Sequence, residues 1–179
     1  TGKTFAFGIP MIEHVIPEQG QVQGLILVPT RELAIQICDE LRSLLAFYTG
    51  IRVAVLYGGA SIVSQAKALE KKPQIVVATP GRLMDHFNRK NIRFDQVQTV
   101  ILDEADRMLD MVFFKDVTRI IEKIRNRKNL GLFSATISQE VMTVSWMYQR
   151  NEVEITVEPK SDDRPDIDQY SIATTPMSK

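Results

Sequence analysis

The sequence predicts an α/β fold, with a mostly parallel sheet and helices on both faces. Short apolar runs of strand length alternate with longer stretches of helical apolar spacing, which is the order expected in a parallel sheet. Several of the runs are continuously apolar, as is typical of strands buried on both faces. Polar motifs follow the runs directly, at the strand ends where such sheets bind their ligands.

The composition is that of a globular protein with one domain. Its 179 residues are 44% hydrophobic and 25% charged, and Lys+Arg and Asp+Glu both count 22, so any nucleic-acid binding must come from local sites. The lone Cys38 excludes an internal disulfide and a cysteine-based metal site, and we expect it to be a core thiol. No signal peptide and no apolar run near the ~18 residues of a membrane span is found, so we expect a cytosolic protein.

The first elements are a helix, a strand and a second helix. Residues 5–16 have helical apolar spacing, and residues 25–28 form an apolar run of strand length. Thr30 is a natural N-cap, and apolar residues then repeat at helical spacing as far as Tyr48. Gly50 follows as a stop signal.

Two further strands and two further helices occupy the middle of the chain. A strand is expected at 51–57, a helix at 61–70 and another strand at 75–78. Thr79 can cap the next helix, and Pro80 suits its first position.

The last third continues the same alternation. A short β-branched strand at 100–102 is followed by an amphipathic helix at 112–124. A strand at 130–133, a helix at 138–146 and a last strand at 154–157 complete the predicted domain.

Residues 158–168 are charged and hold two prolines, so they are predicted to be a linker, and 169–173 a short strand that leaves the domain. Trp146 is interpreted as a packing residue. His14 and His86 have no metal-ligand spacing and are interpreted as ordinary surface or core histidines.

Two adjacent carboxylates, Asp103 and Glu104, end the strand at 100–102. Burying an unpaired charge is costly, so carboxylates at this place need a partner. In nucleotide-hydrolysing proteins an Asp at such a strand end holds Mg²⁺, and a neighbouring Glu can act as general base on the attacking water. The alternative is an acidic helix N-terminus, which suits the helix dipole. The stretch by itself favours the metal only slightly.

The chain opens on Thr1-Gly2-Lys3-Thr4, the last part of a phosphate-binding loop. In such a loop Lys3 reaches the β- and γ-phosphates, the Thr4 hydroxyl binds Mg²⁺, and backbone N–H groups cradle the phosphates. Taken in isolation, G-K-T is a weak signal, and a chance tripeptide explains it better than a phosphate-binding loop does. The motif gains weight because Asp103 follows a strand downstream.

Two strand ends carry the same arrangement of a buried strand, a Thr cap, a helix start and an Arg: Pro29-Thr30-Arg31 and Thr79-Pro80-Gly81-Arg82. Each reads either as a cap with a surface charge or as an anion site at a helix N-terminus. Two such sites suggest successive phosphates of a polymer. Gly58-Gly59 either lets a ligand approach the backbone or forms an ordinary turn.

With Ser134-Ala135-Thr136, five motifs follow five predicted strands. Because the carboxyl ends of parallel strands meet at one edge of a sheet, we expect all five to lie together there. This geometric agreement is stronger than any of the motifs alone.

In this order, T-G-K-T, P-T-R-E-L-A, G-G, T-P-G-R, D-E-A-D and S-A-T resemble the DEAD-box ATP-dependent RNA helicases, and the resemblance covers nearly the whole chain. It implies a RecA-like P-loop domain at 1–157, the first of two such domains. Residues 158–179 would then be a linker and the start of a connection to the second RecA-like domain.

The resemblance also implies ATP and Mg²⁺ as cofactors, RNA as a partner bound through its backbone with little sequence preference, and no membrane partner. The implied roles are ATP binding by Thr1, Gly2, Lys3 and Thr4; Mg²⁺ binding by Thr4 and Asp103, partly through water; catalysis by Glu104, Asp103 and Lys3; RNA binding by Pro29, Thr30, Arg31, Gly58, Gly59, Thr79, Pro80, Gly81 and Arg82; and coupling of the ATP state to RNA by Asp106, Ser134, Ala135 and Thr136.

The sequence departs from the family pattern in several places. The adenine-recognising glutamine motif, the first glycine of the phosphate loop and the second domain with its arginine finger are not in the sequence, so the adenine preference is inferred from the family. Val112 stands where the family often has glycine, which affects only the local turn.

Two alternatives stay open. A DNA helicase or another P-loop translocase would be distinguished by comparing stimulation by RNA and by DNA. A non-catalytic RNA-binding fragment would be distinguished by an ATP hydrolysis assay.

Overall fold

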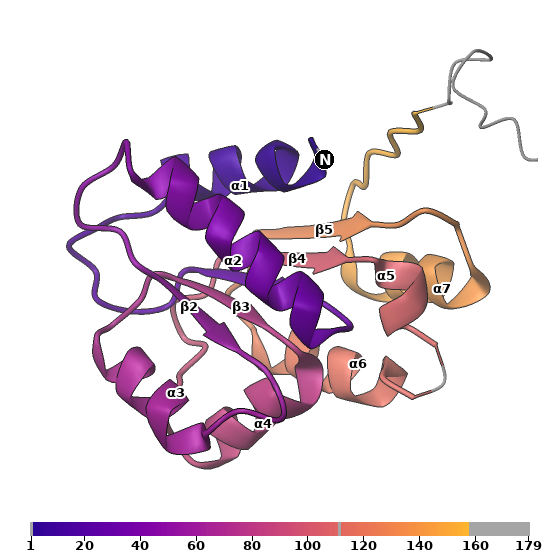
Figure 1. Cartoon of the computed structure of the whole chain (residues 1–179). Coiled ribbons are helices and arrows are strands. Elements are labelled where there is room, and N and C mark those ends of the chain that lie inside the picture. The colour runs from indigo at the N-terminus through magenta and orange to yellow at the C-terminus, as the bar shows by residue number, and fades with distance from the viewer. Residues whose placement is uncertain (1, 111, 158–179) are drawn as a thin grey trace, which may run out of the picture.

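The computed structural model describes residues 2–110 and 112–157. These residues form a single sheet in which every neighbouring pair of strands is parallel, in the order β2-β3-β1-β4-β5 (Figure 1). The α/β class and the parallel sheet are therefore confirmed. The strands are β1 (Gly24–Leu27), β2 (Val53–Leu56), β3 (Ile75–Ala78), β4 (Thr99–Asp103) and β5 (Asn129–Phe133).

Helices connect successive strands, as a parallel sheet requires. Within the described ranges they are α1 (Lys3–Glu13), α2 (Arg31–Leu45), α3 (Ile62–Glu70), α4 (Pro80–Asn88), α5 (Ala105–Met108), α6 (Phe114–Lys123) and α7 (Gln139–Tyr148). None of these helices has the length and apolarity of a membrane span.

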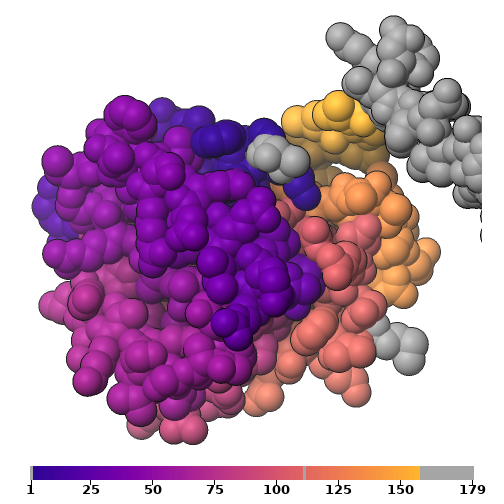
Figure 2. Space-filling model, in the orientation of Figure 1, coloured from indigo at the N-terminus to yellow at the C-terminus, as the bar shows by residue number. Residues whose placement is uncertain are grey.

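Each strand feeds two apolar cores because successive side chains point to opposite faces of the sheet. In β1, Leu25 and Leu27 join the core formed with α3 to α7, while Ile26 joins the core formed with α1 and α2. Helices therefore cover both faces, as predicted (Figure 1). The indigo to purple residues of the first part of the chain form much of the surface seen in Figure 2.

The capping signals place most helix starts correctly. The hydroxyls of Thr30, Ser61 and Ser138 each accept a hydrogen bond from a backbone N–H three residues on, at 3.3 Å. Helix α1 ends at Glu13 rather than at residue 16, since a proline at position 17 disfavours the helical conformation of the residue before it.

Helix α6 begins at Phe114, two residues later than the predicted start at Val112. The N–H of Val112 is instead bonded to the side chain of Asp110, at 3.1 Å, in the preceding turn. Aspartate side chains compete with the helix in this way.

The predicted last strand at 154–157 is wrong. Within the described residues this segment has no strand partner, and the side chains of Val153, Ile155 and Val157 are 82%, 83% and 86% exposed. A strand forms only where another strand satisfies its backbone, and the sheet ends at β2 and β5 without pairing to this segment. Its alternating apolar pattern was therefore not sufficient.

The packing role predicted for Trp146 is also wrong, because its side chain is 64% exposed. Helix α7 buries Val141 and Val144, and at 100° per residue Trp146 lies well away from both. Cys38 is buried and free, His86 is buried and His14 is exposed, as predicted. The predicted linker at 158–168 and the strand at 169–173 lie outside the described residues.

The strand register brings the functional motifs to one edge. Leu27 lies beside both Ala78 and Leu102, Leu56 lies beside Ala78, and Asp103 lies beside Phe133. The five strands thus end together, and the five polar motifs begin where they end. This confirms the expectation of one shared edge.

Candidate functional site

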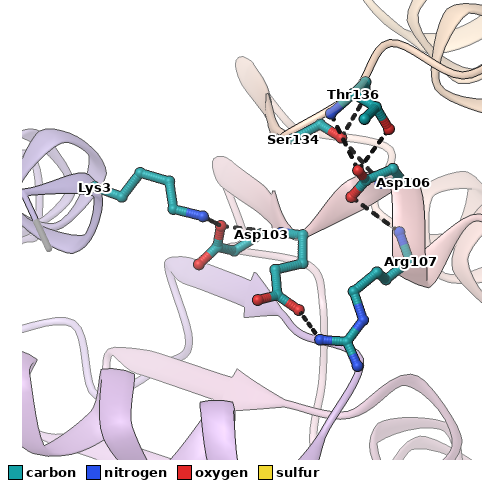
Figure 3. Close-up of polar contacts among 7 residues, drawn as sticks. Lys3, Asp103, Asp106, Arg107, Ser134 and Thr136 are labelled. Carbon is teal, nitrogen blue, oxygen red and sulfur yellow. Dashed lines mark hydrogen bonds and ion pairs between the residues drawn. The ribbon is translucent and has the colours of Figure 1, made fainter. Parts of the chain in front are cut away.

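The end of β4 holds a buried carboxylate, Asp103, which is 2% exposed. Its Oδ1 accepts hydrogen bonds from Lys3 Nζ at 3.0 Å and from the backbone N–H of Glu104 at 2.9 Å (Figure 3). A buried charge is tolerated only when it is paired, and Lys3 supplies the opposite charge. The contact joins the first helix to the sheet edge, across 100 positions of sequence.

Glu104 has left-handed backbone angles, φ 51° and ψ 50°. A residue other than glycine is rarely found there, because the conformation costs roughly 1–2 kcal/mol. The strand before it and the bond from Met108 N to its carbonyl at 3.0 Å hold it in place. Its side chain is 30% exposed, and Arg107 Nη1 donates to its Oε2 at 2.6 Å. The turn thus directs Glu104 outward while Asp103 stays buried.

Asp106 links α5 to the segment after β5. Its Oδ2 accepts bonds from the N–H and hydroxyl of Thr136, at 3.1 and 2.7 Å. Ser134 Oγ accepts from Asp106 N at 3.1 Å and donates to the Thr136 carbonyl at 2.7 Å (Figure 3). Burial alone would raise the pKa of Asp106, but the hydrogen bonds it accepts hold that pKa below its ordinary value.

The oxygen donors at this edge suit a nucleotide-bound Mg²⁺. Proteins bind that ion through one or two carboxylates together with water and substrate phosphates. Asp103 supplies one carboxylate, and Thr4, 4% exposed at the start of α1, supplies a hydroxyl. Among the described residues no group of three or more His, Cys, Asp or Glu could hold a metal. The described residues therefore fit a metal ion whose remaining ligands are water and the phosphate oxygens of a nucleotide.

A second part of the edge gathers around Arg31, the first residue of α2. Its guanidinium carbon lies 5.0 Å from the centroid of the Tyr57 ring, and a Cβ built on Gly59 would lie 3.8 Å from its Nη1. Gly59 has φ +81°, a conformation that favours glycine. The motifs after β1 and β2 therefore meet, with an exposed Arg31 between them.

The start of α4 differs from the other capped helix starts. Thr79 is the N-cap and Pro80 the first helical residue, as predicted, but the Thr79 side chain makes no cap hydrogen bond, which corrects that expectation. The positive end of the dipole of α4 therefore has no hydrogen bond from a side-chain cap. A Cβ built on Gly81 would meet no heavy atom within 4 Å, so nothing in the described residues requires glycine there.

Arg82 points inward, unlike Arg31. Its side chain is 13% exposed, and its Nη1 donates to the Ala60 carbonyl at 2.9 Å and to Gln65 Oε1 at 3.2 Å. Gln65, which the sequence reasoning missed, is buried and also bonds to His86. The available signal was a glutamine four residues before Leu69 on the buried stripe of α3.

The remaining site residues take these places. Gly2 is the N-cap of α1, Pro29 and Thr30 join β1 to α2, Gly58 is exposed with no heavy atom within 4 Å of a built Cβ, and Ala135 is exposed between Ser134 and Thr136. Thr1 lies outside the described residues.

Comparison with known proteins gives a family match and close relatives. The family model described as DEAD/DEAH box helicase matches residues 1–144. "ATP-dependent RNA helicase CshA" of Listeria monocytogenes is 42% identical over 160 residues, which cover 89% of this chain and 31% of the relative. The protein of the same name from Limosilactobacillus reuteri is 41% identical over the whole chain and 36% of its own length. The chain thus spans about a third of the length of these relatives.

Two solved structures extend the match to the fold. A DEAD box protein from the hyperthermophile Methanococcus jannaschii has a TM-score of 0.78 and 44% identity, over 84% of this chain and 41% of that one. The yeast DEAD-box splicing factor Prp28 has a TM-score of 0.77 and 31% identity, over 83% of this chain and 37% of that one.

Proposed function

This chain belongs to the DEAD/DEAH box helicase family, and we propose that it is the first RecA-like domain of an ATP-dependent RNA helicase. On this proposal it spans 1–157, and residues 158–179 lead to a second RecA-like domain. The observation that carries the proposal is the Lys3–Asp103 contact at 3.0 Å, which brings the phosphate-loop lysine to the D-E-A-D strand at the edge shared by the other motifs. The names of the relatives, ATP-dependent RNA helicases, support it.

Lys3 exchanges partners when the nucleotide binds. Its side chain is 44% exposed and can turn to the β- and γ-phosphates, which Thr1, Gly2 and Thr4 help to hold. Asp103 is fixed at the strand end and would be left as an unpaired buried charge, which is strongly destabilising. Thr4 and Asp103 would hold Mg²⁺, partly through water, and the ion would supply the replacement positive charge.

Glu104 is proposed as the general base. Its left-handed turn presents the carboxylate at the surface of the edge, beside the buried Asp103. The Arg107 guanidinium holds the Glu104 carboxylate at 2.6 Å and is itself 63% exposed, so it can yield when a water must be oriented. A general base must lie within hydrogen-bond reach of the proton it accepts.

RNA is proposed to lie along the other half of the edge. Arg31 offers an exposed positive charge, and the uncapped start of α4 offers backbone N–H groups beside the open space at Gly81. Contacts of this kind go to phosphates and carry no direct sequence information. The full proposed set is Pro29, Thr30, Arg31, Gly58, Gly59, Thr79, Pro80, Gly81 and Arg82.

The bonds from Thr136 to Asp106 are proposed to couple the two halves. They tie helix α5, which follows Glu104, to the Ser134-Ala135-Thr136 segment. A shift of α5 when ATP binds or is hydrolysed would therefore also shift this segment. The coupling needs a second state in which these bonds differ, and ATP binding supplies the bias between the states.

The test is an ATPase assay on the natural full-length protein that carries this sequence, without nucleic acid and with RNA or DNA added. Wild-type protein should be stimulated by RNA more than by DNA. Glu104→Gln should keep ATP binding but lose ~10²-fold or more in turnover, because an amide cannot accept the proton. Stimulation by DNA alone would favour another translocase, and ATP-independent RNA binding without turnover would favour a binding module.

A further inference from the structure

A basic surface lies at the edge of the sheet opposite the candidate site. It consists of two segments that lead into strands: residues 89–98, between α4 and β4, and residues 123–128, from the last residue of α6 to β5. Helices α4 and α6 pack side by side, so the two segments are neighbours (Figure 1). Asn126 Nδ2 donates to the Asp95 carbonyl at 3.0 Å and joins the segments directly.

This surface is positively charged, although the whole chain has no net charge. The two segments hold seven of the 22 Lys and Arg residues of the chain but only one of its 22 Asp and Glu residues, Asp95. Asp95 is already paired with Arg93, whose Nε lies 2.7 Å from its Oδ2, and Glu122, just before the second segment, accepts from the Tyr148 hydroxyl at 2.8 Å. The seven cations are Arg89, Lys90, Arg93, Lys123, Arg125, Arg127 and Lys128.

The fold itself explains only part of this charge. Cations are favoured near helix C-termini, which accounts for those at the ends of α4 and α6. Arg127 donates to three backbone carbonyls inside the protein. Neither reason applies to Arg125 and Lys128, which are exposed and take part in none of the ion pairs that the described residues form. Their charges are available to a ligand.

An open hollow of about 370 Å³ lies between the two segments and is lined by Phe87, Phe94, Asp95, Lys123, Arg125 and Asn126. The rings of Phe87 and Phe94 stack with their centroids 4.7 Å apart, and Lys123 Nζ lies 4.8 Å from the Phe87 centroid. This cation–π contact holds the ammonium group at the hollow. Lys123 therefore has less side-chain freedom to lose when an anion binds there.

The chemistry of this surface suits phosphates better than a protein partner. The cores of protein–protein interfaces are rich in aromatic residues and poor in lysine. Here Phe94 is buried, the Phe87 ring is already engaged by Phe94 and Lys123, and the exposed side chains are mainly cations. A nucleic-acid backbone, in contrast, is bound largely through Lys and Arg.

We propose that Lys123, Arg125 and Lys128 form a second RNA-binding surface, which holds backbone phosphates of an RNA that extends beyond the candidate site. Helix α4 begins at the proposed RNA edge and ends at this surface, and its nine residues span about 14 Å. A long or folded RNA can therefore contact both places, whereas a very short one occupies the candidate site alone. This inference rests on the proposed RNA-binding function.

The test compares a long RNA with a short one, in the natural full-length protein. The probes are an RNA hairpin with a single-stranded tail and a hexauridine. For each contact removed in Lys123→Gln/Arg125→Gln/Lys128→Gln, hairpin binding should lose about 0.7 in the log–log slope of affinity against salt. Over the decade from 1 M to 0.1 M salt this corresponds to about 5-fold in affinity per contact. Hexauridine binding and ATP turnover should stay unchanged.

Two further variants keep the test independent of folding. Arg125→Gln/Lys128→Gln leaves the contact between Lys123 and Phe87 intact and should show about two-thirds of the loss in slope. Lys67→Gln is the matched control, because Lys67 is exposed on α3, which packs beside β2 at the far end of the sheet from β5. It should bind both RNAs normally. Thermal unfolding of each variant confirms that the compared proteins are folded.

Each outcome has a defined meaning. Hairpin binding that is unchanged in both multiple variants overturns the proposed surface. An equal loss of hexauridine binding also overturns it, since these cations would then act on the candidate site. If polyglutamate binds more tightly than the hairpin and the triple variant abolishes this, the surface serves an acidic protein partner instead. Wild-type ATP turnover that neither RNA stimulates defeats the proposed function, which is a different result from variants that bind the hairpin normally.

Discussion

Replacing Gly81 with alanine separates what the fold needs at this position from what a ligand needs. Gly81 is the second residue of α4, and a Cβ built on it would meet no heavy atom within 4 Å. Alanine exceeds glycine in helix propensity by about 0.8–1.0 kcal/mol in a helix interior, and near the first turn we expect about half of that. For a domain of this size, 0.5 kcal/mol corresponds to a rise in Tm of roughly 1–2 °C.

RNA binding should change in the opposite direction. If a phosphate approaches the uncapped start of α4, a methyl group on Gly81 occupies the space that the phosphate needs. We expect weaker binding and a salt slope reduced by up to about 0.7, the value for one contact. The assays are thermal unfolding and titration of a labelled oligouridine at several salt concentrations, both on the natural full-length protein.

Ser43→Ala is a matched control. Ser43 is an exposed residue of α2, twelve positions after Arg31, so it lies about 18 Å along the helix from the edge. Alanine is also the better helix former there, so the substitution should raise Tm slightly and leave RNA binding unchanged. A Gly81→Ala protein that loses stability, or that binds RNA like the wild type, would refute the reasoning.

Three further predictions follow from the site and the core. Asp106→Asn should make the stability of the protein depend less on pH in the acid range. Because the pKa of Asp106 in the folded protein lies below the ordinary 3.8, its contribution to stability is complete above pH 3.8 and is lost as the pH falls through the lower folded-state pKa. Urea unfolding at a series of pH values would measure this difference. Cys38, whose pKa burial raises to about 11, should react with an aromatic disulfide reagent at pH 8 only as fast as the protein opens, and immediate labelling would contradict its place in the core. The 179-residue chain alone should show no useful ATP turnover, because the family resemblance places the arginine finger in the second RecA-like domain. In related enzymes an arginine finger raises kcat by roughly 10³–10⁵-fold. RNA-stimulated turnover equal to that of the full-length protein would contradict this prediction.

The fold and the location of the site could be predicted because their signals are local. Apolar runs such as 75–78 have strand length and end at polar motifs, and Thr30 and Ser61 cap their helices as their types suggest. Once strands alternate with helices, the sheet must be parallel and its carboxyl ends must meet. The shared edge therefore followed from the sequence order alone.

The errors arose where distant parts of the chain decide the outcome. The segment 154–157 has the alternation of a strand, but pairing depends on a neighbour that no local pattern encodes. Trp146 resembles a core residue by type, and only its angle on α7 relative to Val141 and Val144 places it outside. Arg82 and Arg31 are equivalent in their motifs, and the bonds from Arg82 to Ala60 and Gln65 distinguish them only in three dimensions.

The D-E-A-D stretch solves a geometric problem that its letters do not reveal. In a regular strand, neighbouring side chains point to opposite faces, so adjacent carboxylates could not serve one edge. The left-handed turn at Glu104 breaks that alternation: Asp103 stays buried against Lys3, while Glu104 turns outward to Arg107. The short helix that begins immediately after the turn then carries Asp106 to Thr136. Backbone strain of roughly 1–2 kcal/mol at one residue thus lets three acidic side chains, two of them adjacent, reach three different partners.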